Sequence, residues 1–180
     1  MQATTTPQLI FKNLNVSYLD VVDQLESASY PEDEKATREK LHLRLTRAPE
    51  LFMGAFVVVV KNNEDDRKEE EILVGYVCST KTSQESLTHE SMSRHEEEGR
   101  TVCIHSVVVR DSWRKRGVGS QMMQQYLRLP FMQHVDQLLL LSKEHLIPFY
   151  EKAGFELLGL SPVDHGSEKW YDLRYVVNKK

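Results

Sequence analysis

Apolar and polar residues follow two different periods along the first half of the chain, which separates strands from helices. Leu19, Val22 and Leu25 are spaced for one helical face. This helix should end at Tyr30, because a residue that precedes proline disfavours the helical region. The whole pattern predicts strands over 9–14, 52–60 and 72–80 and helices over 19–30 and 35–47. The polar stretch 62–71 between the last two strands is expected to form a solvated loop.

The second half of the chain also alternates between strand-like and helix-like patterns. It predicts strands over 101–110, 135–141, 155–160 and 169–177, helices over 117–129 and 145–153, and a short helix around Glu90 in the polar stretch 83–100. The order of elements mixes hairpin connections with crossover connections. We therefore expect an α/β fold with a mixed, mostly antiparallel central sheet of about seven strands, flanked by about four helices.

Length and composition narrow the classes of protein that fit. The chain has 180 residues, which predicts a single domain over 1–180. Its net charge of −4 argues against a general nucleic-acid binder, which is usually basic. Cys78 and Cys103 offer neither a disulfide framework nor metal-site spacing. Without a signal sequence or a membrane-spanning run, the expectation is a cytoplasmic protein, a monomer with no nucleic-acid, membrane or metal partner.

One loop carries the strongest chemical signal. The strand that ends in three valines is followed by Arg114-x-x-Gly117-x-Gly119 and then by an amphipathic helix. The first turn of a helix presents unpaired N–H groups and a positive dipole end, and glycines let an anion approach the backbone. These features suit a diphosphate. The Gly-Lys-Ser/Thr ending of a Walker loop and the third glycine of the dinucleotide fingerprint are both absent. An ordinary tight turn with basic surface residues is the alternative.

This loop resembles the Arg/Gln-x-x-Gly-x-Gly/Ala motif of the GNAT superfamily of N-acetyltransferases, which lies between the fourth strand and the third helix of that fold. Four further segments resemble the arylalkylamine N-acetyltransferases, and more closely their fungal branch that acetylates polyamines. They are Ala48-Pro49-Glu50-Leu51, Leu87-Thr88-His89-Glu90-Ser91, 103–109 and 146–155. The resemblance covers residues 25–175 and implies an acetyl-CoA-dependent enzyme that acetylates small primary amines.

The resemblance also implies a role for each matching residue. The catalytic residues would be His105, near the amine, and Tyr150, near the thioester sulfur. The cofactor-binding residues would be Val107, Val108 and Val109, whose main chain pairs with the pantetheine arm, and the pyrophosphate loop of Arg114, Lys115, Arg116, Gly117, Val118, Gly119 and Ser120. Tyr30, Leu141 and Trp170 fall where the family lines its amine pocket.

The chain departs from the vertebrate members of this family at one position. Those enzymes carry two histidines on the fourth strand, separated by one residue, whereas this chain has Cys103 at the first position and only His105 at the second. The proton route proposed for the family uses both histidines and a water chain. Because this chain has only one of the two histidines, its own proton route is an open question. Cys103 is interpreted as a small apolar wall residue, because no activating partner is evident.

The residues predict a direct mechanism. An aliphatic ammonium with a pKa near 10.4 must lose a proton before it attacks a thioester, and a histidine suits that base role. A backbone N–H of Val107 or a neighbour would stabilise the oxyanion, and a tyrosine would protonate the leaving thiolate. Tyr30 and Trp170 favour an aromatic acceptor, whereas Glu32, Asp33 and Glu34 favour a polyamine, so we expect a broad range that includes both arylalkylamines and diamines. Acetylation of protein N-termini or lysines and a non-catalytic acyl-CoA-binding module remain the alternatives.

Overall fold

Seven strands form one sheet in the computed structural model, which describes residues 8–63, 66–163 and 165–178. The strands are β1 (Ile10–Asn13), β2 (Phe52–Asn63), β3 (Asp66–Thr82), β4 (Thr101–Val109), β5 (Gln137–Ser142), β6 (Glu156–Leu160) and β7 (Tyr171–Val176). Their order across the sheet is β1-β2-β3-β4-β5-β7-β6. Only β4 and β5 run parallel to each other, so the predicted mixed, mostly antiparallel sheet is confirmed.

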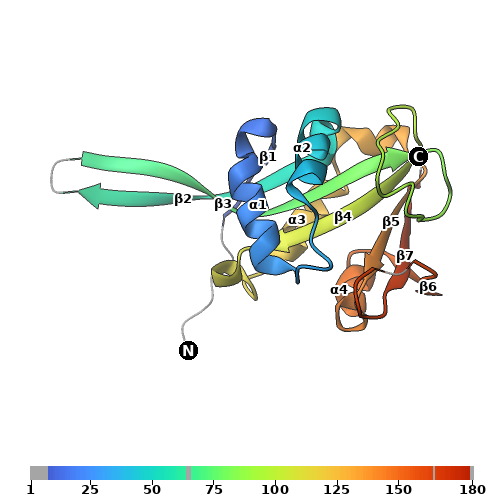
Figure 1. The fold of residues 1–180 in the computed structure, drawn as a ribbon. Coiled ribbons are helices and arrows are strands. Elements are labelled where there is room, and N and C mark those ends of the chain that lie inside the picture. The colour runs from blue at the N-terminus through green and yellow to red at the C-terminus, as the bar shows by residue number, and fades with distance from the viewer. Residues whose placement is uncertain (1–7, 64–65, 164, 179–180) are drawn as a thin grey trace.

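Four α-helices cover the two faces of the sheet. They are α1 (Leu19–Ser29), α2 (Arg38–Arg47), α3 (Val118–Tyr126) and α4 (Ile147–Lys152). Apolar residues of α1 and α2 pack in one core cluster, and those of α3 and α4 pack in another. Figure 1 shows α1 and α2 side by side in front of the sheet, with α3 behind it. The predicted α/β architecture with helices on both faces is therefore confirmed.

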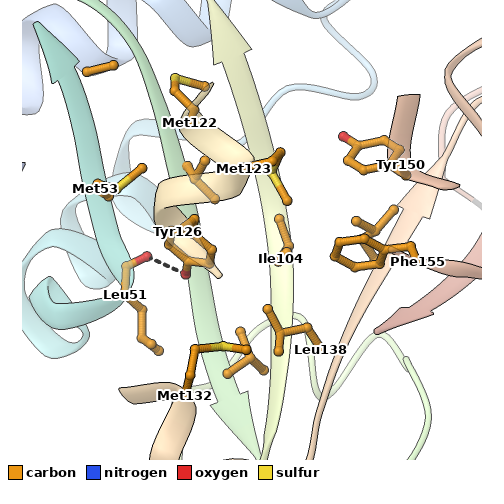
Figure 2. Close-up of a cluster of buried hydrophobic side chains, with 14 of the residues drawn as sticks. Leu51, Met53, Ile104, Met122, Met123, Tyr126, Met132, Leu138, Tyr150 and Phe155 are labelled. Atoms are coloured by element: carbon orange, nitrogen blue, oxygen red, sulfur yellow. Dashed lines mark hydrogen bonds between the residues drawn. The ribbon is translucent and has the colours of Figure 1, made fainter. Parts of the chain in front are cut away.

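The core beneath α3 fixes the start of that helix against β4. Met122, Met123 and Tyr126 are fully buried on the sheet-facing side of α3, next to Ile104 of β4 (Figure 2). The Tyr126 hydroxyl donates a 2.9 Å hydrogen bond to the carbonyl of Leu51, which anchors the far end of the helix. Because the whole apolar face of α3 is held in this way, its N-terminus and the loop before it have a fixed position beside β4.

The sheet opens between β4 and β5. The two strands pair only where Thr101–Ile104 lies beside Gln137–Leu140. Beyond this point β4 continues to Val109 along β3, whereas β5 pairs with β7. The second half of β4 therefore presents a backbone edge that no strand covers within the described part of the chain. Such an edge can accept another extended chain or ligand backbone.

A long two-stranded ribbon replaces most of the polar, solvated connection predicted over 62–71, of which residues 64–65 lie outside the described residues. β2 and β3 continue to Asn63 and Asp66, and the glutamates at 69–71 lie opposite the valines at 58–60. These polar residues form part of a strand because they pair with β-branched valines, which have a strong preference for extended backbone. β1 pairs with β2 only as far as Phe56, so the ribbon extends away from the body of the molecule (Figure 1).

Two smaller predictions also differ from the structure. The helix expected to reach Leu129 ends at Tyr126, and Pro130 follows the tight turns that close it. Proline lacks a backbone donor and disfavours helix at the residue before it, which explains the early end. Around Glu90 the chain forms only a turn, closed by a 3.1 Å hydrogen bond from Met92 N to the Thr88 carbonyl.

Candidate active site

A β-bulge in β4 aims two consecutive side chains into one cavity. Ser79 of β3 pairs with Ile104, whereas Cys78 pairs with Ser106, so His105 is an extra residue in the ladder. Before the bulge, Ile104 belongs to the core on the α3 side, and beyond it Val107 packs against the same core. Side chains normally alternate between faces, and the extra residue resets this alternation. Consequently His105 and Ser106 both line the cavity on the α1 and α2 side.

This acceptor cavity brings together the residues predicted to hold the amine. It has a volume of about 110 Å³ and is lined by His105, Tyr30, Leu141, Trp170 and Tyr150. These residues come from segments separated by as many as 140 positions in the chain. This volume is small, which suits a small acceptor better than an extended one.

A second, larger groove of about 560 Å³ meets the acceptor cavity. It is lined by Val107, Val108, Val109, Arg114, Lys115, Gly117, Val118, Gly119 and Ser120, which are nine of the ten residues predicted to bind the cofactor. Tyr30, Glu34, Val107 and Tyr150 line both spaces. The groove and the acceptor cavity therefore meet at Tyr150 and the middle of β4.

The loop before α3 has the backbone conformation that an anion site needs. Lys115 and Gly117 have φ angles of 59° and 79°, and α3 begins directly after Gly117 without a side-chain cap. The first N–H groups of the helix therefore lie at the groove without a capping side chain. Arg114 donates from Nε to the Val109 carbonyl at 3.0 Å. Arg116, the tenth predicted residue, does not line the groove, and its guanidinium lies 5.0 Å from the centre of the Trp113 ring.

Phe149 is a groove residue that the sequence reasoning missed. A methyl group added at Gly119 would meet the Phe149 ring at 3.4 Å, so the ring lies directly against the start of α3. Phe149 also makes an edge contact with Tyr150, with ring centroids 5.0 Å apart. Its place beside Tyr150 in the Pro-Phe-Tyr segment is the signal that points to it.

His105 is held by a buried threonine. Its Nε2 lies 2.7 Å from Thr80 Oγ1, and Thr80 itself is fully buried. Burial lowers the pKa of His105 well below its usual range, with smaller contributions from the cationic side chains of Arg44 and Lys40. The imidazole is therefore neutral at pH 7. If Nε2 donates to the threonine, Nδ1 is free to accept a proton.

Tyr150 and Tyr30 keep their protons at neutral pH. Burial alone raises the pKa of Tyr150, and burial together with the nearby Tyr150 raises that of Tyr30. A protonated phenol is a hydrogen-bond donor and a potential acid. In Figure 2 the hydroxyl end of Tyr150 is directed toward β4. The Tyr30 hydroxyl donates to the Val107 carbonyl at 3.4 Å, so that carbonyl faces the open edge of the strand.

Glu26 of α1 is a buried carboxylate that the sequence reasoning also missed. It is only 1% exposed and accepts hydrogen bonds from Ala36 N at 2.8 Å, from Ser106 Oγ at 3.1 Å and from the Tyr76 hydroxyl. These bonds tie the loop after α1 to the bulge of β4. Val22 lies four residues earlier on the same buried helical face, and this spacing is the signal that could have revealed the residue.

The acidic run 32–34 does not act as one unit. Glu32 is exposed and pairs with Lys35 at 2.8 Å. Glu34 is buried and lies 2.9 Å from Lys143 Nζ, which also reaches the exposed Glu168 at 3.1 Å. Of this run only Glu34 lines the acceptor cavity, and it does so as the partner of a lysine.

Residues from three parts of the chain contact one another beside the acceptor cavity. Lys143 Nζ lies 5.5 Å from the centre of the Trp170 ring, and His165 Nε2 lies 2.9 Å from the Glu34 carbonyl oxygen. The indole N–H of Trp170 donates to the His165 carbonyl. These contacts join the loop after α1 to the residue that follows β5 and to the segment before β7. We name this group, Glu34, Lys143, His165, Glu168 and Trp170, the latch.

Cys103 has the surroundings of an inert thiol. It is fully buried against Leu87 and Leu139, and burial raises its pKa to about 12. A thiol with this pKa stays protonated and is a poor nucleophile. Among the residues that the structure describes, no group of three or more potential metal ligands is found. None of the helices in the same part of the chain has both the length and the apolar character for a membrane crossing.

The comparisons with known proteins agree with this geometry. A sequence profile described as "Acetyltransferase (GNAT) family" matches residues 19–155. The serotonin N-acetyltransferase of Mesocricetus auratus is 34% identical over 131 residues, which are 72% of this chain and 58% of that protein. The chain thus spans less than two thirds of this relative's length. The protein belongs to the GNAT family of acetyltransferases, whose cosubstrate is acetyl-CoA.

Solved structures with low sequence identity share the fold. The loading GNATL domain of CurA from Lyngbya majuscula superposes with a TM-score of 0.74 at 13% identity, covering 94% of this chain and 98% of that one. A chain of the NatC complex bound to Gag peptide and CoA superposes with a TM-score of 0.70 at 16% identity, covering 95% and 99%. These likenesses confirm the expected GNAT fold.

Proposed function

We propose that this protein transfers the acetyl group of acetyl-CoA to small primary amines, with arylalkylamines as its preferred acceptors. The observation that carries the proposal is the junction of the two spaces at Val107 and Tyr150. An acetyl thioester in the groove would place its carbonyl at this junction, and an amine in the cavity would approach it from the side of His105. Holding both reactants in this geometry supplies much of the rate acceleration.

The cofactor would be held mainly by backbone groups. The loop Lys115–Ser120 would bind the pyrophosphate with the N–H groups at the start of α3, and the open edge of β4 would pair with the pantetheine arm. The N–H and carbonyl of one strand residue point to the same side. Since the Val107 carbonyl faces the open edge, its N–H faces there too and is suited to stabilise the oxyanion.

The proton steps would use the neutral imidazole and the protonated phenol. His105 would accept a proton from the ammonium, directly or through water, and the free amine would attack the thioester carbon. As the carbon–sulfur bond breaks, Tyr150 would protonate the departing thiolate, and the second proton lost by the attacking nitrogen would return to the tyrosinate. No covalent enzyme intermediate is needed. This scheme uses one histidine, in keeping with the buried and unreactive Cys103.

The charges around the acceptor cavity favour an aromatic monoamine over a polyamine. Its two carboxylates are already engaged, Glu26 by hydrogen bonds and Glu34 by Lys143. The cavity is also lined by three cations, Lys35, Lys40 and Arg44. A second ammonium on the acceptor would have no free carboxylate to meet there. Tyr30, Leu141 and Trp170 instead offer an apolar and aromatic wall.

Protein N-termini are the second class of acceptor, because the NatC structure with the same fold holds a peptide. A peptide needs an open path for the residues that follow its first amine. The latch joins three segments beside the acceptor cavity, and the cavity itself is small. Both features favour a small amine.

An acetyl-transfer assay tests this proposal directly. The panel would hold tryptamine, phenylethylamine, putrescine, spermidine and a short peptide with a free N-terminus, each at the same ionic strength. We expect the highest kcat/KM for the two aromatic amines. The highest value for the peptide would overturn the acceptor class, and acetyl-CoA binding without transfer to any amine would favour a non-catalytic acyl-CoA-binding module.

A further inference from the structure

Arg44 is a buried cation on the wall of the acceptor cavity. It lies on α2 between Leu41 and Leu45, which pack into the core, and it is only 5% exposed. Lys40, one helical turn earlier, lines the same cavity. The α2 helix therefore contributes two positive charges to the space in which His105 lies.

No carboxylate within the described residues pairs with Arg44. The partner of its guanidinium is the Cys78 thiol, with Nη1 and Sγ 3.8 Å apart. The two carboxylates of the cavity are engaged elsewhere, because Glu26 accepts hydrogen bonds from neutral donors and Glu34 pairs with Lys143. A buried charge without an opposite charge is costly to the fold, so its presence at a reaction site suggests a function.

We propose that Arg44, assisted by Lys40, is an electrostatic positioning residue that disfavours protonation inside the acceptor cavity. It keeps His105 neutral and drives the bound amine toward its free, nucleophilic form. The part of this inference that concerns the amine rests on the proposed function. The part that concerns His105 does not depend on it. This inference assigns to α2 a part of the work that the proton route proposed for the vertebrate enzymes gives to a second histidine.

The physical argument is the repulsion between like charges. Protonation of His105 or of the bound amine would create a cation near Arg44 and Lys40, and the low dielectric of the cavity strengthens their repulsion. The proton of the ammonium passes through His105 to solvent, and the amine nitrogen then forms its bond to the thioester carbon as the carbon–sulfur bond breaks. Neighbouring cations destabilise the ammonium and the imidazolium alike, so they favour loss of this proton from the cavity and leave both groups neutral. A lysine beside another cationic group is activated in the same way.

Besides His105, nine titratable groups of the described residues face the same cavity, Lys40 and Arg44 among them. They are Glu26, Tyr30, Glu34 and Lys35 from α1 and the loop after it, Lys40 and Arg44 from α2, His89 from the segment before β4, Tyr150 from α4, and His165 from the latch. The buried thiols of Cys78 and Cys103 lie on the neighbouring strands. After burial, Arg44 and then Lys40 are the groups that lower the pKa of His105, and the carboxylates do not offset them.

The first test measures His105 itself and needs no acetylation. In protein labelled with ¹³C-histidine, NMR would follow each imidazole from pH 5 to 8, and the His105 signal would be identified by its loss in His105→Gln. In Arg44→Met we expect the pKa of His105 to rise by about one to three units toward its ordinary value, the scale of unit charges about 4–12 Å apart at an effective dielectric of about 20. Arg44→Lys should keep the low pKa. Arg47→Met removes an exposed charge from the same helix and should change nothing.

The second test measures acetyl transfer to tryptamine from pH 6 to 9 with the same variants. We expect kcat/KM of Arg44→Met to fall most at pH 6 and to approach the parent value at pH 9, where deprotonation is easier. Arg44→Lys should restore most of the loss at low pH.

Two results would overturn the proposal. One is an unchanged pKa of His105 in a folded Arg44→Met variant. The other is a loss of activity that is equal at all pH values and is not restored by lysine, since that pattern indicates a role in shape alone. If the parent protein acetylates no amine, the function proposed above fails, and the histidine titration still decides the role of Arg44.

Discussion

The cofactor groove and the acceptor cavity are built by different means. Just over half of the residues that line the groove come from one contiguous stretch, residues 107–120 of β4 and the loop that leads into α3. The residues that line the cavity come from α1, α2, α4, β4, β5 and the segments before β4 and before β7. Backbone groups bind any ligand of the right shape, whereas side chains select among ligands. The groove should therefore tolerate changes of side chain but not of backbone, and the cavity should show the opposite behaviour.

The largest effect should come from the junction of the two regions. Tyr150→Phe removes the acid that protonates the thiolate, so kcat should fall by about 10²–10⁴-fold. The phenylalanine keeps the ring contacts with Phe149 and Phe155, so the affinity for acetyl-CoA should stay within a few-fold of the parent. Single-turnover kinetics and calorimetry on the same preparation measure both. Unchanged turnover while chemistry limits the rate would remove Tyr150 from the mechanism.

A backbone change in the groove should come next. Gly117 has a φ of 79°, and Gly117→Asp adds strain and a negative charge beside the expected phosphates. Acetyl-CoA binding should weaken by about 100-fold. Gly117→Ala separates strain from charge and should lie between the parent and the aspartate variant. Gly159, with a φ of 131° and open space around it, gives a matched control on β6. Calorimetric binding equal to that of the parent in Gly117→Asp would refute the loop assignment.

A side-chain change in the cavity should depend on pH. His105→Gln removes the proton acceptor but keeps a polar group near Thr80, so kcat/KM for tryptamine should fall by about 10²-fold near neutrality. The loss should shrink as the pH rises toward the pKa of the amine, because more free amine is then present. Because the pKa of His105 is lowered, the parent should lose activity only when the pH falls well below 6.5. A deficit of the same size from pH 6 to 10 would assign His105 to structure or binding.

The smallest expected effect is a change of preference at the latch. Lys143→Met would leave the Glu34 carboxylate without its lysine at the cavity wall. A diamine could then place its second ammonium there, so the ratio of kcat/KM for putrescine to that for tryptamine should rise several-fold. Lys169→Met, which removes an exposed lysine nearby, is the control. An equal change for both amines would mean that Glu34 does not select among acceptors.

The two regions also differed in how far the sequence could reveal them. Nine of the ten predicted cofactor residues line the groove, because a phosphate loop is a local feature with a fixed spacing. The exception, Arg116, stacks on Trp113, and its spacing alone could not show that. In the cavity, Glu26 and Arg44 went unnoticed because their meaning depends on what packs against them. The bulge at His105 was equally hidden, since it arises from the register between β3 and β4.

The same distinction holds for the fold. Apolar runs predicted every strand of the body, because burial requires them in a fixed period. The glutamates of the ribbon were read as loop, because their place in a ladder depends on pairing with valines across the hairpin. Elements fixed by local pattern were therefore predictable, whereas those fixed by a partner strand were not.

The claim that the groove and the cavity form one site is tested most directly by a bisubstrate ligand. Tryptamine joined through an acetyl bridge to the sulfur of CoA would span both spaces, and calorimetry would compare its Kd with that of CoA alone and of a peptide conjugate with the same bridge. We expect the tryptamine conjugate to bind at least about 100-fold more tightly than CoA, because two linked ligands reinforce each other only when both sites are reached. The gain should be lost in Trp170→Ala. Equal affinity for CoA and for the tryptamine conjugate would contradict the account.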